Sequence, residues 1–273
     1  MAKVFLNWFW MLHKFFVWKN VKHKNINSGK TCLIFGNGGS LRYYDFSALP
    51  DLPAFCTTHS LADKRMKDVD VRYWILSDPY LLYPLRYIDF HKKIFKNKLL
   101  PIFKRYALNN FNVTLITSLT NLYSFFWHSN KIIYFHHFGK KSNLSYDLSE
   151  NFTSCGGSLD IMIGAARYFG FSKAILLGCD YLGSPKLEGH FYGNNAPFVG
   201  MDDPSYCSRI KEIAGDLEIV VVLPEGHKST FFSYVNFGKY FGVAEKYQSR
   251  ESLIDQECLA MMTEASQYKQ IHL

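Results

Sequence analysis

The six cysteines of this 273-residue chain include no Cys-x-x-Cys pair and are scattered between positions 32 and 258. Scattered thiols argue against a disulfide framework and a zinc site, and they favour a reducing cytoplasm. Internal repeats and low-complexity segments are also missing. Because 48% of the residues are hydrophobic, the composition predicts an ordinary domain with a sizeable packed core.

Long uninterrupted apolar runs are missing as well. Residues 1–25, MAKVFLNWFWMLHKFFVWKNVKHKN, contain Asn7 and Lys14 and are too polar to span a bilayer. No small-residue cleavage site follows them, which argues against a signal peptide. On a helical wheel Lys3, Asn7 and Lys14 form one narrow polar stripe. We expect residues 1–29 to form an amphipathic segment in the inner face of a membrane; the alternative is a terminal helix packed on the protein's own domain.

Acidic residues are absent from two stretches that hold much of the net charge of +8. Residues 1–30 contain six lysines, and residues 91–105 contain six further lysines and arginines. The rest of the chain has 19 basic and 23 acidic residues, so the basicity is local and argues against a nucleic-acid partner. Basic residues alternate with aromatic and aliphatic ones in both stretches, which favours a peripheral contact with an anionic membrane through 1–25 and 91–105.

The apolar runs that are present are short and resemble strands. Several alternate with helical patterns, which predicts an α/β fold with a Rossmann-like, mostly parallel sheet and helices on both faces. We expect one domain over 30–273, with a small helical lid at 80–110 and a long loop at 183–204. The expected strands are 31–35, 54–57, 71–76, 113–116, 132–135, 174–177 and 219–223, and the expected helices are 157–169, 205–216 and 250–268.

The first expected strand leads into a glycine-rich turn, GNGGS at 36–40. Glycine lets a backbone approach a ligand closely, and a helix beginning at Ser40 would present free N–H groups to an anion. The turn is not G-x-G-x-x-G, because Leu41 replaces the third glycine, and it lacks the G-K-[ST] of a P-loop. It therefore predicts either a phosphate-bearing ligand or a tight turn without one.

Polar residues follow other strand ends too, and ligands of parallel sheets bind outside the carboxyl ends of the strands. We expect a site where these segments meet: Thr57-Thr58-His59, Ser77-Asp78-Pro79, Asp180-Tyr181 and GHFYGNN at 189–195.

Three segments resemble the bacterial sialyltransferases of glycosyltransferase family 42: GNGGSLRYYDFSALP (36–50), GGSLDIMIGAARYFGFSKAILLGCDY (156–181) and HFYG (190–193). The second segment is equally similar to the 6-hydroxymethylpterin diphosphokinase-like domain. The sialyltransferase resemblance implies a variant of the GT-A fold. It also implies metal-independent, inverting transfer of a nonulosonic sugar from a CMP-activated donor to a surface-glycan or lipid-linked acceptor, without a cofactor.

The resemblance also implies site residues. His190 matches the general base, and Gly36, Asn37 and Gly38 would line the phosphate and ribose of the donor. Thr57 and Asp78 replace two asparagines of the family. The complete set of expected donor-binding residues is Gly36, Asn37, Gly38, Ser40, Thr57, Gly157, Ser158, Asp180, Tyr181 and Tyr192. For Asp180 the alternative to binding the ribose is that it orients a loop.

The residue types suit this chemistry. Backbone N–H groups from Gly38 to Ser40 and tyrosine hydroxyls could stabilise a leaving phosphate without a metal, and a histidine could deprotonate the acceptor near neutral pH. Asp78, the second catalytic candidate, has three possible roles: nucleophile in a retaining transfer, acceptor contact, or cap of a helix near Pro79. We assign no metal, since the pair at 202–203 is typical of a solvated loop and His136-His137 lacks a third ligand.

Two other functions stay open. A pterin diphosphokinase would need ATP and Mg²⁺, for which we see no carboxylate pair beyond Asp78 and Asp180. A non-catalytic membrane-surface scaffold would use the same fold without chemistry. A homo-oligomer is compatible with each of these readings.

Overall fold

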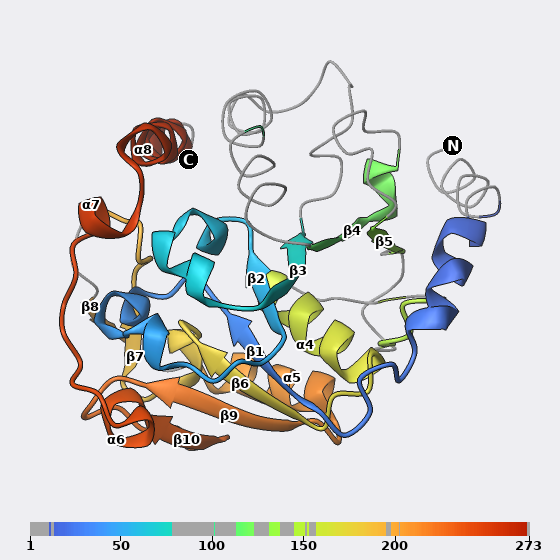
Figure 1. Ribbon diagram of the computed structural model, residues 1–273, viewed down its shortest axis with the longest axis horizontal. Helices are drawn as coiled ribbons and strands as arrows, with labels where there is room; N and C mark the ends of the chain where they lie inside the picture. Colours follow the sequence, from blue (N-terminus) through green and yellow to red (C-terminus); the bar gives the residue numbers. More distant parts are fainter. Residues whose placement is uncertain are drawn as a thin grey trace.

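A computed structural model describes residues 11, 14–77, 101, 113–122, 131–136, 145–150, 152, 157–194, 198–201 and 203–271, the last seven by backbone alone. Its centre is an eight-stranded, wholly parallel sheet in the order β10-β9-β6-β1-β2-β3-β4-β5 (Figure 1). The α/β class with a Rossmann-like parallel sheet is therefore confirmed. The strands of this sheet are β1 (Thr31–Phe35), β2 (Ala54–Thr57), β3 (Val71–Leu76), β4 (Thr114–Ser118), β5 (Ile132–Phe135), β6 (Lys173–Leu177), β9 (Glu218–Leu223) and β10 (Ser233–Asn236).

Both faces of the sheet are buried, which explains why the strands read as continuous apolar runs. One face packs against α4 (Ser158–Tyr168) and α5 (Pro204–Ala214). The other packs against short 3₁₀ helices and the C-terminal helices α6 (Phe237–Phe241), α7 (Arg250–Leu253) and α8 (Gln256–Ile271) (Figure 1). The 3₁₀ helices on this face are η2 (Gly39–Tyr43), η3 (Phe46–Ala48), η4 (Ser60–Ala62) and η5 (Lys64–Asp68). The 3₁₀ helices elsewhere in the described residues are η1 (Lys19–His23), η7 (Leu119–Asn121) and η8 (Asp180–Leu182).

Some expected elements differ from the structure. The turn after β1 leads into the five-residue 3₁₀ helix η2 rather than into an α-helix at Ser40. The expected helix at 250–268 is interrupted at residues 254–255. The expected loop at 183–204 contains an antiparallel pair, β7 (Lys186–Glu188) and β8 (Phe198–Gly200). Apart from residue 101, the expected lid at 80–110 lies outside the described residues, as does the basic stretch 91–105.

The described part of the N-terminal segment, from residue 14 onward, is attached to this domain beside β5 and α4 (Figure 1). The backbone N–H groups of Asn25 and Asn27 donate to the carbonyls of Tyr168 and Phe169 at the end of α4, at 3.1 and 2.8 Å. Residues 14–29 are thus built onto the α/β domain. Among the described residues, no helix combines the length and the apolar character needed to cross a membrane.

Candidate functional site

The order of the strands reverses between β1 and β6. From β1 the chain adds β2 to β5 on one side, and it then returns to place β6, β9 and β10 on the other side (Figure 1). Such a switch point is where parallel α/β sheets bind ligands, outside the carboxyl ends of the strands. The glycine turn follows β1 here, and Asp180 follows β6. The expected meeting of these two segments is therefore observed.

The register of β1 and β6 explains the glycines of the turn. Phe35 pairs with Leu177, so Gly36 leaves the sheet directly beside Gly178. The Gly38 N–H donates to the Gly178 carbonyl at 2.8 Å, and a Cβ on Gly38 would lie 2.6 Å from that oxygen and closer still to the Asp180 carboxylate. Because Gly38 has φ −64°, the requirement is for space rather than for a left-handed backbone.

The N–H groups of the turn are already used within the protein. Gly38 donates to the Gly178 carbonyl, Gly39 to the Gly189 carbonyl at 3.1 Å, and Ser40 to Oδ2 of Asp180 at 2.9 Å. The expectation that these three groups would bind a leaving phosphate is therefore wrong for this conformation. They join the turn to the two segments that face it.

Ser40 and Asp180 form a buried pair beneath the turn, with 0% and 1% of their surfaces exposed. The Ser40 hydroxyl also donates to Oδ1, so both carboxylate oxygens are engaged. Burial raises the pKa of Asp180 from 3.8 to about 6, although the hydrogen bonds from Ser40 and the charge of His227 act in the opposite direction. Ser40 was expected to bind the donor, and Asp180 to bind the donor or to orient a loop; the observed contacts of the pair are with each other, beneath the turn.

Asn37 is the partly exposed member of the turn. Its Oδ1 accepts hydrogen bonds from the hydroxyls of Thr57, at the end of β2, and of Ser60. Within the described part of the chain, no acceptor is hydrogen-bonded to Nδ2 of Asn37, so this group can donate to a ligand. Thr57 is 4% exposed, and its hydrogen bond to Oδ1 fixes the orientation of the Asn37 amide.

The segment carrying His190 pairs with the glycine turn. Gly38 and His190 form an antiparallel bridge, flanked by the hydrogen bond from the Phe191 N–H to the Asn37 carbonyl at 3.1 Å. Arg42, which is 2% exposed, donates from Nε to the Phe191 carbonyl at 2.7 Å and from Nη2 to the Gly193 carbonyl at 2.5 Å. A buried guanidinium thus shapes the loop that holds His190.

Three rings are stacked at this loop. The ring centroids of His190 and Tyr192 lie 5.0 Å apart with planes 14° apart, and Tyr192 and His59 lie 4.7 Å apart with planes 20° apart. His190 is exposed at the end of the stack, and burial raises the pKa of Tyr192. Sequence reasoning placed His59 at the expected site without assigning it a chemical role, and it did not single out Arg42, although Arg42 lies within the first motif.

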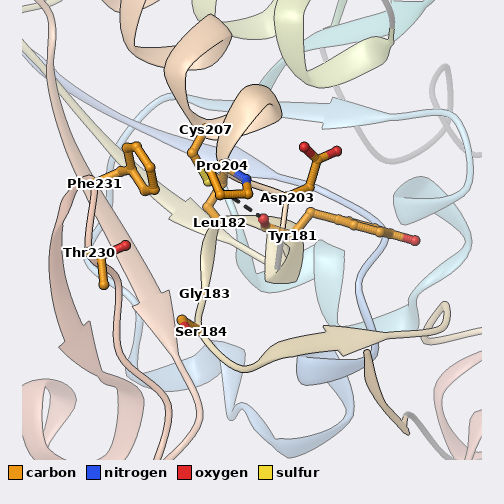
Figure 2. Close-up of a pocket in the computed structure, with 9 residues that line it drawn as sticks. All are labelled: Tyr181, Leu182, Gly183, Ser184, Asp203, Pro204, Cys207, Thr230 and Phe231. Atoms are coloured by element: carbon orange, nitrogen blue, oxygen red, sulfur yellow. Dashed lines mark hydrogen bonds between the residues drawn. The ribbon is translucent and has the colours of Figure 1, made fainter. Parts of the chain in front are cut away.

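Tyr181 lies beyond the edge of this stack. It contributes electrostatically to the raised pKa of Tyr192, and the residue itself is 38% exposed. Figure 2 shows its ring directed away from a cavity of about 50 Å³ below α5, which Leu182, Cys207 and Phe231 help to line. That volume holds a water or two rather than a nucleotide. The Tyr181 ring lies instead under the ammonium group of Lys186, 5.0 Å from the ring centroid, and edge-on to Tyr206, with ring centroids 6.5 Å apart.

The start of α4 meets the end of β3. The hydroxyl oxygens of Ser158 and Ser77 lie 2.9 Å apart, and Ser77 follows β3 directly. Gly157 precedes the helix, and an added Cβ there would meet nothing within 4 Å. These residues share the carboxyl edge with the glycine turn but lie toward β3. Asp78 lies outside the described residues. Among those described, no three His, Cys, Asp or Glu side chains are grouped as metal ligands would be.

No family model matches the chain, and no curated protein matches it in sequence. The structure is similar to that of the sialyltransferase CstII from Campylobacter jejuni in complex with cytidine-5'-monophosphate, at 16% identity and a TM-score of 0.43 over 86% of this chain and 99% of that one. It is similar to CST-II with a trisaccharide acceptor and CMP, at 14% identity and a TM-score of 0.44 over 86% and 99%. The α-2,3-sialyltransferase Cst-I from Campylobacter jejuni gives 14% identity and a TM-score of 0.43 over 89% and 94%. Similarity at this level transfers no residue role to this chain.

Proposed function

We propose that the protein is a glycosyltransferase that moves a sialic-acid-like sugar from a CMP-activated donor to a glycan acceptor. The observation that carries the proposal is the bridge between Gly38 and His190. It joins two of the three sialyltransferase-like motifs, about 150 residues apart in sequence, at the switch point of the sheet. The same pairing places the backbone of Asn37 beside that of Phe191, the residue after His190.

In the proposed reaction His190 accepts the proton of the acceptor hydroxyl while that oxygen attacks the anomeric carbon of the donor. The bond from this carbon to the phosphate oxygen breaks, and CMP leaves with the bonding electron pair. A single displacement of this kind inverts the anomeric configuration. The stack on Tyr192 holds the imidazole plane, and Arg42 fixes the backbone of its loop.

Charge develops on the leaving phosphate as the bond breaks. The hydroxyls of Tyr181 and Tyr192 and the Nδ2 group of Asn37 are the donors proposed to meet it, in place of the turn N–H groups and of a metal. Ser158 is proposed to approach the donor from the β3 side. Asp78 keeps the three roles expected for it, and the acceptor is proposed to be held at the inner face of a membrane.

The test begins with calorimetric titration of the full chain with CMP, UDP and ATP, each with and without Mg²⁺. Binding of CMP alone, without Mg²⁺, is expected. Transfer from CMP-N-acetylneuraminic acid to a fluorescent oligosaccharide is then compared for the wild type and His190→Ala. We expect the variant to lose transfer while its Kd for CMP stays within about twofold, since His190 acts on the acceptor.

His23→Gln, in the N-terminal segment, is the matched control and is expected to transfer at the wild-type rate. Normal transfer by His190→Ala would remove the general base from the mechanism. ATP binding that requires Mg²⁺ would favour the diphosphokinase instead, and a protein that binds no nucleotide would favour the scaffold.

A further inference from the structure

The N-terminal helix comprises the described residues 11 and 14–18, and η1 continues it to His23. We propose that the outward side of this helix docks the protein on an anionic bilayer surface. This docking face comprises the exposed apolar side chains of Met11, Phe15, Trp18 and Val21 and the exposed lysines Lys14, Lys19 and Lys22. Nothing in the proposed transfer reaction uses these residues. The inference therefore stands on the surface of the chain and can fail or succeed independently of the sugar chemistry.

The inward side of this helix is attached to the domain. Val17 is 0% and Asn20 3% exposed, and Nδ2 of Asn20 donates to the carbonyls of Tyr134 and Leu148, each at 2.7 Å. The hydroxyl of Tyr168 in α4 donates to the Asn20 carbonyl at 3.1 Å. Since Val17 and Asn20 are three positions apart, one side of the helix faces the domain and the opposite side faces outward.

The outward side of the helix exposes several large apolar side chains to solvent. Phe15 is 53%, Trp18 61%, Met11 63% and Val21 49% exposed. The rings of Phe15 and Trp18 are stacked with centroids 6.3 Å apart, so they form one continuous patch rather than isolated exposed residues. Contiguous exposed apolar side chains mark an interaction surface, and aromatic rings of this kind suit the headgroup region of a bilayer.

The charges around the patch select an anionic partner. Lys14, Lys19 and Lys22 are exposed, and the first acidic residue of the sequence is Asp45. The ammonium group of Lys19 lies 4.3 Å from the centroid of the Phe15 ring, so charge and apolar surface are interleaved. A bilayer accepts both at once, with rings at the acyl boundary and ammonium groups among anionic headgroups.

The experiment is co-sedimentation of the full chain with vesicles of phosphatidylcholine, with and without phosphatidylglycerol. We expect binding to the anionic vesicles that weakens as salt is added, because surface charges are screened. Phe15→Ser/Trp18→Ser removes the rings, and Lys14→Glu/Lys19→Glu/Lys22→Glu reverses the charge. Each is expected to lower the partition coefficient by about tenfold or more.

The matched control is Tyr234→Ser/Tyr240→Ser, which removes two exposed aromatic residues from β10 and α6 and is expected to bind like the wild type. The changed side chains are exposed, so all variants are expected to keep the wild-type melting temperature and affinity for CMP. Three results would overturn the proposal: wild type that ignores anionic vesicles, face variants that bind as well as the control, or face variants that instead abolish a dimer seen by sedimentation without lipid.

Discussion

Asp180→Asn tests whether the buried pair under the glycine turn governs the pH dependence of stability. The Asp180 carboxylate is 1% exposed and accepts from both the N–H and the hydroxyl of Ser40. An asparagine of the same shape can accept the N–H through Oδ1 and donate to the hydroxyl through Nδ2. The substitution therefore removes the titrating proton and keeps the packing.

The magnitude follows from the pKa of Asp180, which burial raises from 3.8 to about 6. Between these two values the folded state holds the proton more tightly than the unfolded state. The contribution of this group to stability is therefore fully present below about pH 4, and it is lost as pH rises through about 6. A shift of about two pKa units at about 1.4 kcal/mol each corresponds to about 3 kcal/mol.

The assay is urea denaturation of the wild type and Asp180→Asn at several pH values from about 4 to about 8. The difference in the free energy of unfolding, variant minus wild type, is expected to increase as pH rises, by up to about 3 kcal/mol at neutral pH. Parallel pH profiles for the two proteins would refute the reasoning. Asp203→Asn is the matched control. A hydrogen bond from Ser205 lowers the pKa of this exposed carboxyl, so its titration lies below the assayed range and its pH profile is expected to run parallel to that of the wild type.

Three further predictions concern the site at the carboxyl ends of the strands. Gly38→Ala is expected to lower the free energy of unfolding by about 2 kcal/mol in urea denaturation, because its Cβ would overlap the Gly178 carbonyl; a change below about 0.5 kcal/mol would contradict this. Arg42→Lys is expected to reduce the transfer rate about tenfold in steady-state kinetics while the Kd for CMP is kept, since one ammonium cannot hold two carbonyls of the loop at 190–193; an unchanged rate would exclude the positioning role. Asn37→Ala is expected to raise the Kd for CMP about tenfold by calorimetry, and an unaltered Kd would mean that Nδ2 does not contact the nucleotide.

The strands were predictable because the sheet is buried on both faces. A parallel strand covered on each side needs apolar residues at consecutive positions, so runs such as TCLIF and AFCT mark β1 and β2 directly. β10 was missed because it is an edge strand with the sequence SYVN and two exposed residues, and it gives no such run. β7 and β8 were missed because three-residue strands in a polar loop have no periodicity to read.

The candidate site was predictable in its location and less so in its contacts. Polar residues after strand ends indicated the carboxyl edge, and Gly36–Ser40, Asp180 and His190 do meet there. The sequence alone could not distinguish the side chains that face a ligand from those that contact another residue. That distinction separates Asn37, with a free amide N–H among the described contacts, from Ser40 and Asp180, which satisfy each other in the interior.

The sequence by itself determined the α/β class, the positions of most strands and the segments that gather at one edge, because apolar runs and turn residues act over a few neighbouring positions. Only the tertiary structure explains why the turn is rich in glycine. The in-register ends of β1 and β6 bring Gly36 and Gly38 against Gly178 and Asp180, about 140 residues away, where a Cβ has no space. It also decided that one side of the N-terminal helix is attached to the domain while Phe15 and Trp18 face outward, since burial depends on what the rest of the chain places beside a residue.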